Sequence, residues 1–151
     1  MSINPFDPKT VFLAKHAQHV VLIHFPIALF IVATGFDVVA RWTKNLALAA
    51  AAYLNLCVAA ISTLPVVATG LIAWRWALEG QRLKGILLLH LVLGSISTLL
   101  VWLVLWLRHK GRRQSDPLPS SFVLCVELVG LLAITITGHL GGFLSGVNSP
   151  M

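Results

Sequence analysis

Four long runs of apolar residues, separated by short polar links, make up most of this 151-residue chain. A helix needs roughly 20 apolar residues to cross the hydrocarbon core of a bilayer, and each run is at least that long. The runs extend over about Val20–Trp42, Leu46–Trp74, Gly85–Leu107 and Phe122–Gly146. They predict four transmembrane helices.

The links between the runs are Thr43–Asn45, Arg75–Lys84 and Arg108–Ser121. Links this short make consecutive helices pack antiparallel. We therefore predict an all-α fold, an integral membrane antiparallel four-helix bundle over residues 20–146. An extramembrane or interfacial segment, 1–19, would precede it, and a C-terminal tail, 147–151, would follow it. The tryptophans support these bounds because they lie near predicted helix ends, where their rings favour the headgroup level: Trp42, Trp74, Trp76, Trp102 and Trp106.

The composition agrees with a membrane protein, with 58% hydrophobic and 11% charged residues, whereas a soluble domain carries about 25% charged residues. A net charge of +6 would suggest nucleic acid as the partner of a soluble protein. Here the basic residues lie between hydrophobic runs, so lipid headgroups are the expected partner. Cys57 and Cys125 lie inside the runs and are interpreted as small apolar residues.

Basic residues also predict the orientation in the membrane. The first and third links with their flanks hold Arg41, Lys44, Arg108, Lys110, Arg112 and Arg113, and the other side holds Lys9, Lys15, Arg75, Arg82 and Lys84. The cluster Arg108–Arg113 favours the cytoplasm for the first and third links. Both termini would then be periplasmic in a bacterial inner (cytoplasmic) membrane. Pro5, Asp7 and Pro8 precede the first run, unlike the basic start of a signal peptide, so we expect the first helix to be retained.

Three histidines fall at nearly the same predicted depth on three helices. His24 lies near the start of the first run, His90 near the start of the third and His139 near the end of the fourth. In an antiparallel bundle these positions share one side, on the order of 6–11 Å inside the apolar slab at 1.5 Å per residue. Ionisable residues at such depth are rare and usually functional, so the three histidines predict a cofactor or metal site.

The residues one or two turns from these histidines are small. They are Gly94 and Ser97 beside His90, Thr135 and Gly142 beside His139, and Ala28 beside His24. Such residues leave room for a flat group such as a porphyrin, and they also let membrane helices pack closely. With a histidine on each face, the cofactor interpretation is the stronger one.

Two further histidines precede His24 and complete the pattern H-x-x-H-x-x-x-x-H. His16 and His19 are three residues apart and share a face of a helix. Each alone is typical of a solvated interfacial residue, but together they are candidate metal ligands or an entry site. Pro26 follows His24 and removes one backbone hydrogen bond, so we expect the helix to be kinked or loosened there.

The segment HAQHVVLIHFPIALF, followed by Asp37, resembles the signature of a family of small bacterial membrane proteins called domain of unknown function 2231. The block Val67–Trp74, the pair Leu89-His90 and the pair Gly141-Gly142 fit as well, so the resemblance covers Lys15 to Phe143. The chain has Ala17 and Val20 where the family usually has proline after each of the first two histidines. His139 has no counterpart in the pattern. Some relatives carry fused Rieske iron–sulfur or c-type cytochrome domains, so the resemblance implies membrane electron transfer.

Charged residues near the opposite face of the membrane predict ion pairs. Asp37 and Arg41 are four apart, and Glu127 falls at a similar depth on the fourth run. We expect Asp37 to pair with Arg41, and Glu127 with Arg41 or Arg108, at the edge of the bundle. A proton path or a quinone-site carboxylate is the alternative. The chain shows no nucleophile–base arrangement, no phosphate loop and no paired carboxylates of the kind typical of hydrolases, so we predict no hydrolytic or transferase site.

Three functions remain open. The first is a b-type haem protein that transfers electrons, with His24 and His90 as the preferred axial pair and His139 as a replacement ligand or a donor to a propionate. Its redox partner would be a c-type cytochrome, a Rieske protein or a quinone. The second is a copper or zinc site built from the histidines. The third is a homo-oligomer or a cofactor-free structural subunit of a larger redox or photosynthetic membrane complex.

Overall fold

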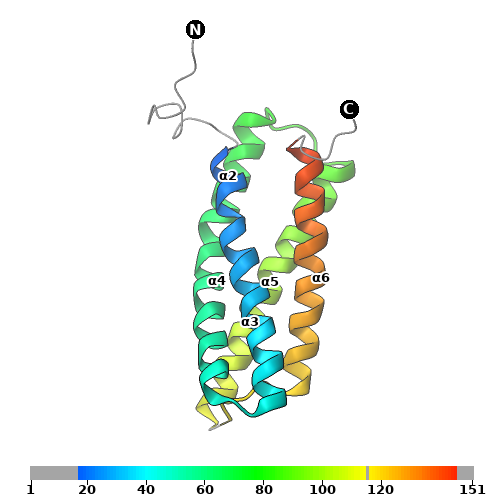
Figure 1. Ribbon diagram of the computed structural model, residues 1–151. Helices are drawn as coiled ribbons and strands as arrows, with labels where there is room; N and C mark the ends of the chain where they lie inside the picture. The colour runs from blue at the N-terminus through cyan, green and yellow to red at the C-terminus, as the bar shows by residue number, and fades with distance from the viewer. Residues whose placement is uncertain (1–16, 115, 146–151) are drawn as a thin grey trace.

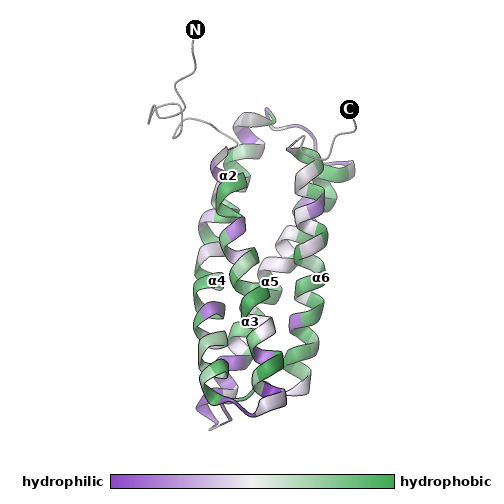
Figure 2. Cartoon of the chain, viewed as in Figure 1, coloured by the Kyte–Doolittle hydropathy of each residue, from purple (hydrophilic) through white to green (hydrophobic). Residues whose placement is uncertain are grey.

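The computed structural model describes residues 17–114 and 116–145, which form an antiparallel bundle of helices (Figure 1). The elements are α2 (Ala17–Leu22), α3 (His24–Thr43), α4 (Leu46–Ile72), the π-helical turn η1 (Ala73–Ala77), α5 (Gly85–Arg113) and α6 (Ser121–Leu144). Four stretches are long and apolar enough to cross a membrane: Gln18–Thr43, Leu46–Trp76, Gly85–Arg113 and Ser121–Leu144. The predicted all-α membrane bundle is confirmed. The helices consist mostly of hydrophobic residues, and hydrophilic residues are frequent near the two ends of the bundle (Figure 2).

The first span is interrupted at Ile23, where α2 gives way to α3. Pro26 explains the break, because it has no N–H to donate to the carbonyl of Leu22 four residues earlier. The neighbouring bonds are kept, since the amide of Ile23 donates to the His19 carbonyl at 3.1 Å and that of Ile27 to the Ile23 carbonyl at 3.4 Å. The expected loosening therefore lies directly beside His24.

The third helix is longer than the sequence pattern predicted. α5 continues to Arg113, so the basic run expected to begin the third link at Arg108 is helical instead. Arginine and lysine are good helix formers, and cations in a last turn are stabilised by the helix dipole. The connection is thereby reduced to residues 114–120, and Ser120 caps α6 by accepting a hydrogen bond from the amide of Val123.

Two helical hairpins build the bundle, because α3 packs mainly against α4, and α5 mainly against α6. Alanine-rich α4 permits the close approach of α3, as small residues do in membrane helices. Large and small apolar side chains from both hairpins fill the centre: Phe30, Ala33, Leu56, Ala59, Ala60, Val101, Val104, Val123 and Ile134.

The core occupies one end of the bundle. Among residues 18–29, 64–76, 78–96 and 135–145, which we call the histidine end, only Pro26 and Ala73 are buried. All other buried residues lie in 30–63 and 97–134, which we call the core end. The ribbons of the two hairpins also diverge toward the histidine end (Figure 1). Side chains of the two hairpins are therefore interlocked at the core end and loosely associated at the other.

Candidate functional site

His90 is held against α6 by a hydrogen bond across the second hairpin. Its Nδ1 lies 3.0 Å from the backbone oxygen of Thr137. A carbonyl oxygen only accepts, so Nδ1 carries the proton and Nε2 keeps its lone pair. This is the arrangement in which histidines bind metals, because the bond to Nδ1 fixes both the tautomer and the ring orientation.

Gly141 makes room for the His90 ring. A Cβ placed on Gly141 would lie 3.2 Å from Cε1 of His90, closer than ordinary packing allows. The ring thus occupies the space that a side chain at 141 would take, one helical turn beyond Thr137. Sequence analysis noted Gly141 only as part of a family-like pair and did not identify Thr137, although a glycine at this depth opposite a histidine was a usable signal.

The small residues predicted beside His90 lie in the same helix–helix contact. The hydroxyls of Ser97 and Thr137 are 3.3 Å apart, and a Cβ on Gly94 would lie 3.6 Å from Cγ2 of Thr137. Gly94 and Ser97 therefore let α5 approach α6, which is the packing role that sequence analysis weighed against a cofactor role.

The other two predicted histidines, His24 and His139, are exposed on the surface of the bundle, and so is Ala28. His24 lies at the start of α3, in the first hairpin. The His139 ring meets Phe143 of its own helix edge-to-face, with ring centroids 5.1 Å apart. His24, His90 and His139 do share one end of the bundle, but they are not gathered: within residues 17–114 and 116–145, no group of three His, Cys, Asp or Glu side chains is placed to hold a metal ion.

His19 repeats the geometry of His90 in the first hairpin. Its Nδ1 lies 3.1 Å from the backbone oxygen of Val66 and 3.3 Å from Oγ1 of Thr69, and a Cβ on Gly70 would lie 3.0 Å from its Cε1. In each hairpin, a histidine thus forms a hydrogen bond with a backbone carbonyl of the neighbouring helix. Its ring also packs against the glycine that lies four residues after that carbonyl. His16, the other residue of the predicted entry site, lies outside the described residues.

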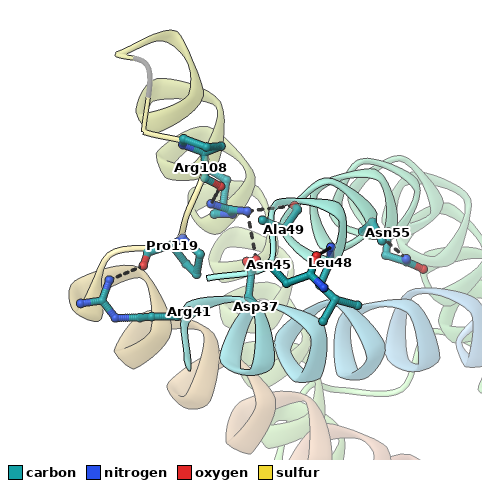
Figure 3. Close-up of polar contacts among 10 residues, drawn as sticks. Asp37, Arg41, Asn45, Leu48, Ala49, Asn55, Arg108 and Pro119 are labelled. Atoms are coloured by element: carbon teal, nitrogen blue, oxygen red, sulfur yellow. Dashed lines mark hydrogen bonds and ion pairs between the residues drawn. The ribbon is translucent and has the colours of Figure 1, made fainter. Parts of the chain in front are cut away.

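A second polar site lies at the core end, where Arg108 forms an ion pair with Asp37. Nη2 of Arg108 is 3.0 Å from Oδ1 of Asp37 and 3.1 Å from the backbone oxygen of Ala49 (Figure 3). Nη1 donates to the backbone oxygen of Pro117 at 2.9 Å. The expected pairing of Asp37 with Arg41 was wrong, because Arg108 reaches Asp37 from α5 inside the bundle rather than at its edge.

Arg41 is instead bonded to the third link. Its Nη1 donates to the backbone oxygen of Pro119 at 2.7 Å and its Nη2 to Oγ of Ser121 at 2.9 Å. Glu127, which was expected to pair with Arg41 or Arg108 at the edge, is fully buried, and neither of its carboxyl oxygens has a hydrogen-bond partner. Arg41 thus anchors the link to α3, while three charged side chains are enclosed beneath it.

A family model described as "Predicted membrane protein (DUF2231)" matches residues 15–148, which include all four spans. Comparisons with curated proteins and with solved structures returned no match.

Proposed function

Because the chain belongs to the DUF2231 family of predicted membrane proteins, and His19, His24, His90 and His139 lie at one end of a four-helix bundle, we propose that it is a membrane-embedded b-type haem protein that transfers electrons. The observation that carries the proposal is the hydrogen bond from His90 Nδ1 to the Thr137 carbonyl. It leaves Nε2 as the nitrogen through which the half-buried imidazole would bind iron.

His90 would hold the haem from the second hairpin, and a histidine of the first hairpin would hold it from the other side. His24 is our preferred partner, since it lies at the same end of the bundle and beside the break at Ile23. His139 is the replacement ligand or a donor to a propionate, and His19 and His16 are further ligand candidates. The sparse burial at the histidine end supports this assignment, because the two hairpins do not fill that region with interlocked side chains.

Haem bound there supplies one-electron chemistry, and the chain tunes it through ligands, burial and hydrogen bonds. The carbonyl of Thr137 makes the His90 imidazole a stronger electron donor by accepting a hydrogen bond from its Nδ1–H. His90 is half-buried in the contact between α5 and α6. A c-type cytochrome, a Rieske protein or a quinone is the proposed redox partner.

We place the protein in the bacterial inner membrane, with the histidine end and both termini on the periplasmic side. The last turns of α5 support this orientation, because Arg108, Lys110, Arg112 and Arg113 concentrate basic charge at the core end, as expected of a cytoplasmic face.

The test is a reduced-minus-oxidised absorption spectrum of the protein purified from haem-replete cells. We expect Soret and α bands of b-type haem, lost in His90→Ala and His24→Ala. His109→Ala is the matched control, because His109 lies on α5 at the other end and bonds the Tyr53 hydroxyl at 3.0 Å. A colourless protein containing stoichiometric copper or zinc would replace haem with a metal-ion site. A colourless, metal-free protein that co-purifies in a larger complex would instead indicate a structural subunit.

A further inference from the structure

Three charged side chains from three helices are buried together at the core end. Asp37 of α3 and Glu127 of α6 are 0% exposed, and Arg108 of α5 is 2% exposed. A charge enclosed in this way is costly unless it is paired and fully hydrogen-bonded. No residue of the histidine end belongs to this cluster, so the role of the cluster is separate from that of a haem.

The cluster has one cation for two carboxyl groups. Arg108 forms its ion pair with Asp37, and the Glu127 carboxyl lies close enough to Asp37 and Arg108 to interact with both electrostatically. From α4 the cluster is faced by the Ala49 carbonyl and by Tyr53, which interacts with Arg108. Arg41 is bonded to Pro119 and Ser121, and Arg112 lies over the Tyr53 ring. Two ionised carboxylates here would leave one negative charge uncompensated in the interior.

The hydrogen bonds of the cluster are incomplete in the same place. Both carboxyl oxygens of Glu127 and Oδ2 of Asp37 are buried without a hydrogen-bond partner in the structure. Ionised carboxylates only accept hydrogen bonds, so two facing carboxylates have nothing to offer each other. One added proton changes this, because a protonated carboxyl becomes a donor to its neighbour.

We propose that Asp37, Arg108 and Glu127 form an intramembrane proton-binding site, in which Glu127 holds one proton and donates a hydrogen bond through it to Oδ2 of Asp37. Binding transfers a proton from water to a Glu127 oxygen and changes the net charge of the cluster from −1 to 0. The bound proton satisfies an oxygen on each carboxyl, while Arg108 keeps Asp37 ionised.

The site exchanges its proton with the side of the membrane that carries the third link. Arg108 bonds the Pro117 carbonyl of that link, whereas apolar side chains, Phe30, Leu56, Val101 and Val104, fill the centre of the bundle toward the histidines. Arg108 and His90 lie about 27 Å apart along α5, at 1.5 Å per residue. Proton binding at the core end is therefore independent of haem binding at the histidine end.

Infrared spectroscopy of the full chain in lipid nanodiscs tests the proposal. The chain has only five acidic side chains, so substitutions of single carboxyl groups can assign a carboxylic-acid band. We expect a carbonyl band of a protonated carboxylic acid at neutral pH, lost in Glu127→Gln and kept in the matched control Glu79→Gln. In Asp37→Asn the band should persist at a shifted frequency, because the proton loses its carboxylate acceptor.

The absence of this band from the unmodified protein at neutral pH would overturn the proposal, as would its survival in Glu127→Gln. If Glu127→Gln fails to fold, measurements on the unmodified protein still test the proposal. Its band must shift in D2O and vanish at alkaline pH, and a band that does neither contradicts an exchangeable proton. Haem content does not enter either measurement.

Discussion

His90 and Thr137 join α5 to α6 through a 3.0 Å hydrogen bond between Nδ1 and a backbone carbonyl. The bond lies where few other side chains are buried, so it is a main determinant of how the second hairpin closes at the histidine end. It also selects Nε2 for coordination. A perturbation of the ring position therefore tests packing and ligation together.

Gly141→Ala should displace the His90 ring. The added Cβ would lie 3.2 Å from Cε1 of His90, so the ring must shift or its bond to Thr137 must lengthen. Disturbing a ligand's supporting contacts commonly costs about 10–100-fold in metal affinity, so we expect a loss of haem on that order, read from the Soret absorbance per protein. Gly138→Ala is the control, because nothing lies within 4 Å of a Cβ there. Equal haem content in both variants would contradict a ligand role for His90.

Gly130→Ala should destabilise the core end. Its Cβ would lie 3.0 Å from Cζ and 3.2 Å from Cε1 of Phe30, a ring that is fully buried between the hairpins. Overpacking a filled core costs about 1–3 kcal/mol, so the unfolding temperature in detergent should fall. Gly35→Ala is the matched control, because a Cβ added at Gly35 has no neighbour within 4 Å. Alanine is also a better helix former than glycine, so this variant should not be destabilised. An unfolding temperature unchanged by Gly130→Ala would mean that Phe30 has space to move.

Sequence reasoning predicted the four membrane-spanning helices because a bilayer demands long apolar segments, although it ended the third helix at Leu107 instead of Arg113. It failed for Asp37, since the four-residue spacing to Arg41 describes only neighbours on one helix. The true partner is Arg108, which the sequence pattern assigned to the third link. Arg108 reaches Asp37 because α5 extends to Arg113 and because the two hairpins pack together at the core end. His90 was found from its depth, whereas its partner Thr137 depends on the rotation of α6, which hydropathy does not determine.

The two arginines near Asp37 should differ sharply in their effect on stability. Arg108→Ala leaves the carboxylate of Asp37 buried without its cation, and removing one partner of a buried pair costs about 3–5 kcal/mol. Arg41→Ala removes bonds to Pro119 and Ser121 at the link, two contacts that are partly or fully exposed, so its cost should be much smaller. Unfolding temperatures of both variants in one detergent make the comparison. A larger decrease in unfolding temperature for Arg41→Ala than for Arg108→Ala would support the pairing of Asp37 with Arg41 that was expected from the sequence.

The orientation of the bundle can be read with two cysteine substitutions. Gln81 lies in the link between η1 and α5, at the histidine end, and Gln114 caps the other end of α5; both are exposed. In a background with Cys57→Ser and Cys125→Ser, Gln81→Cys should react with a membrane-impermeant maleimide added outside spheroplasts. Gln114→Cys should react only after the membrane is opened, since the basic turns of α5 favour the cytoplasm. The opposite labelling would place the histidines on the cytoplasmic side, and a periplasmic c-type cytochrome or Rieske protein would then be excluded as the direct electron partner.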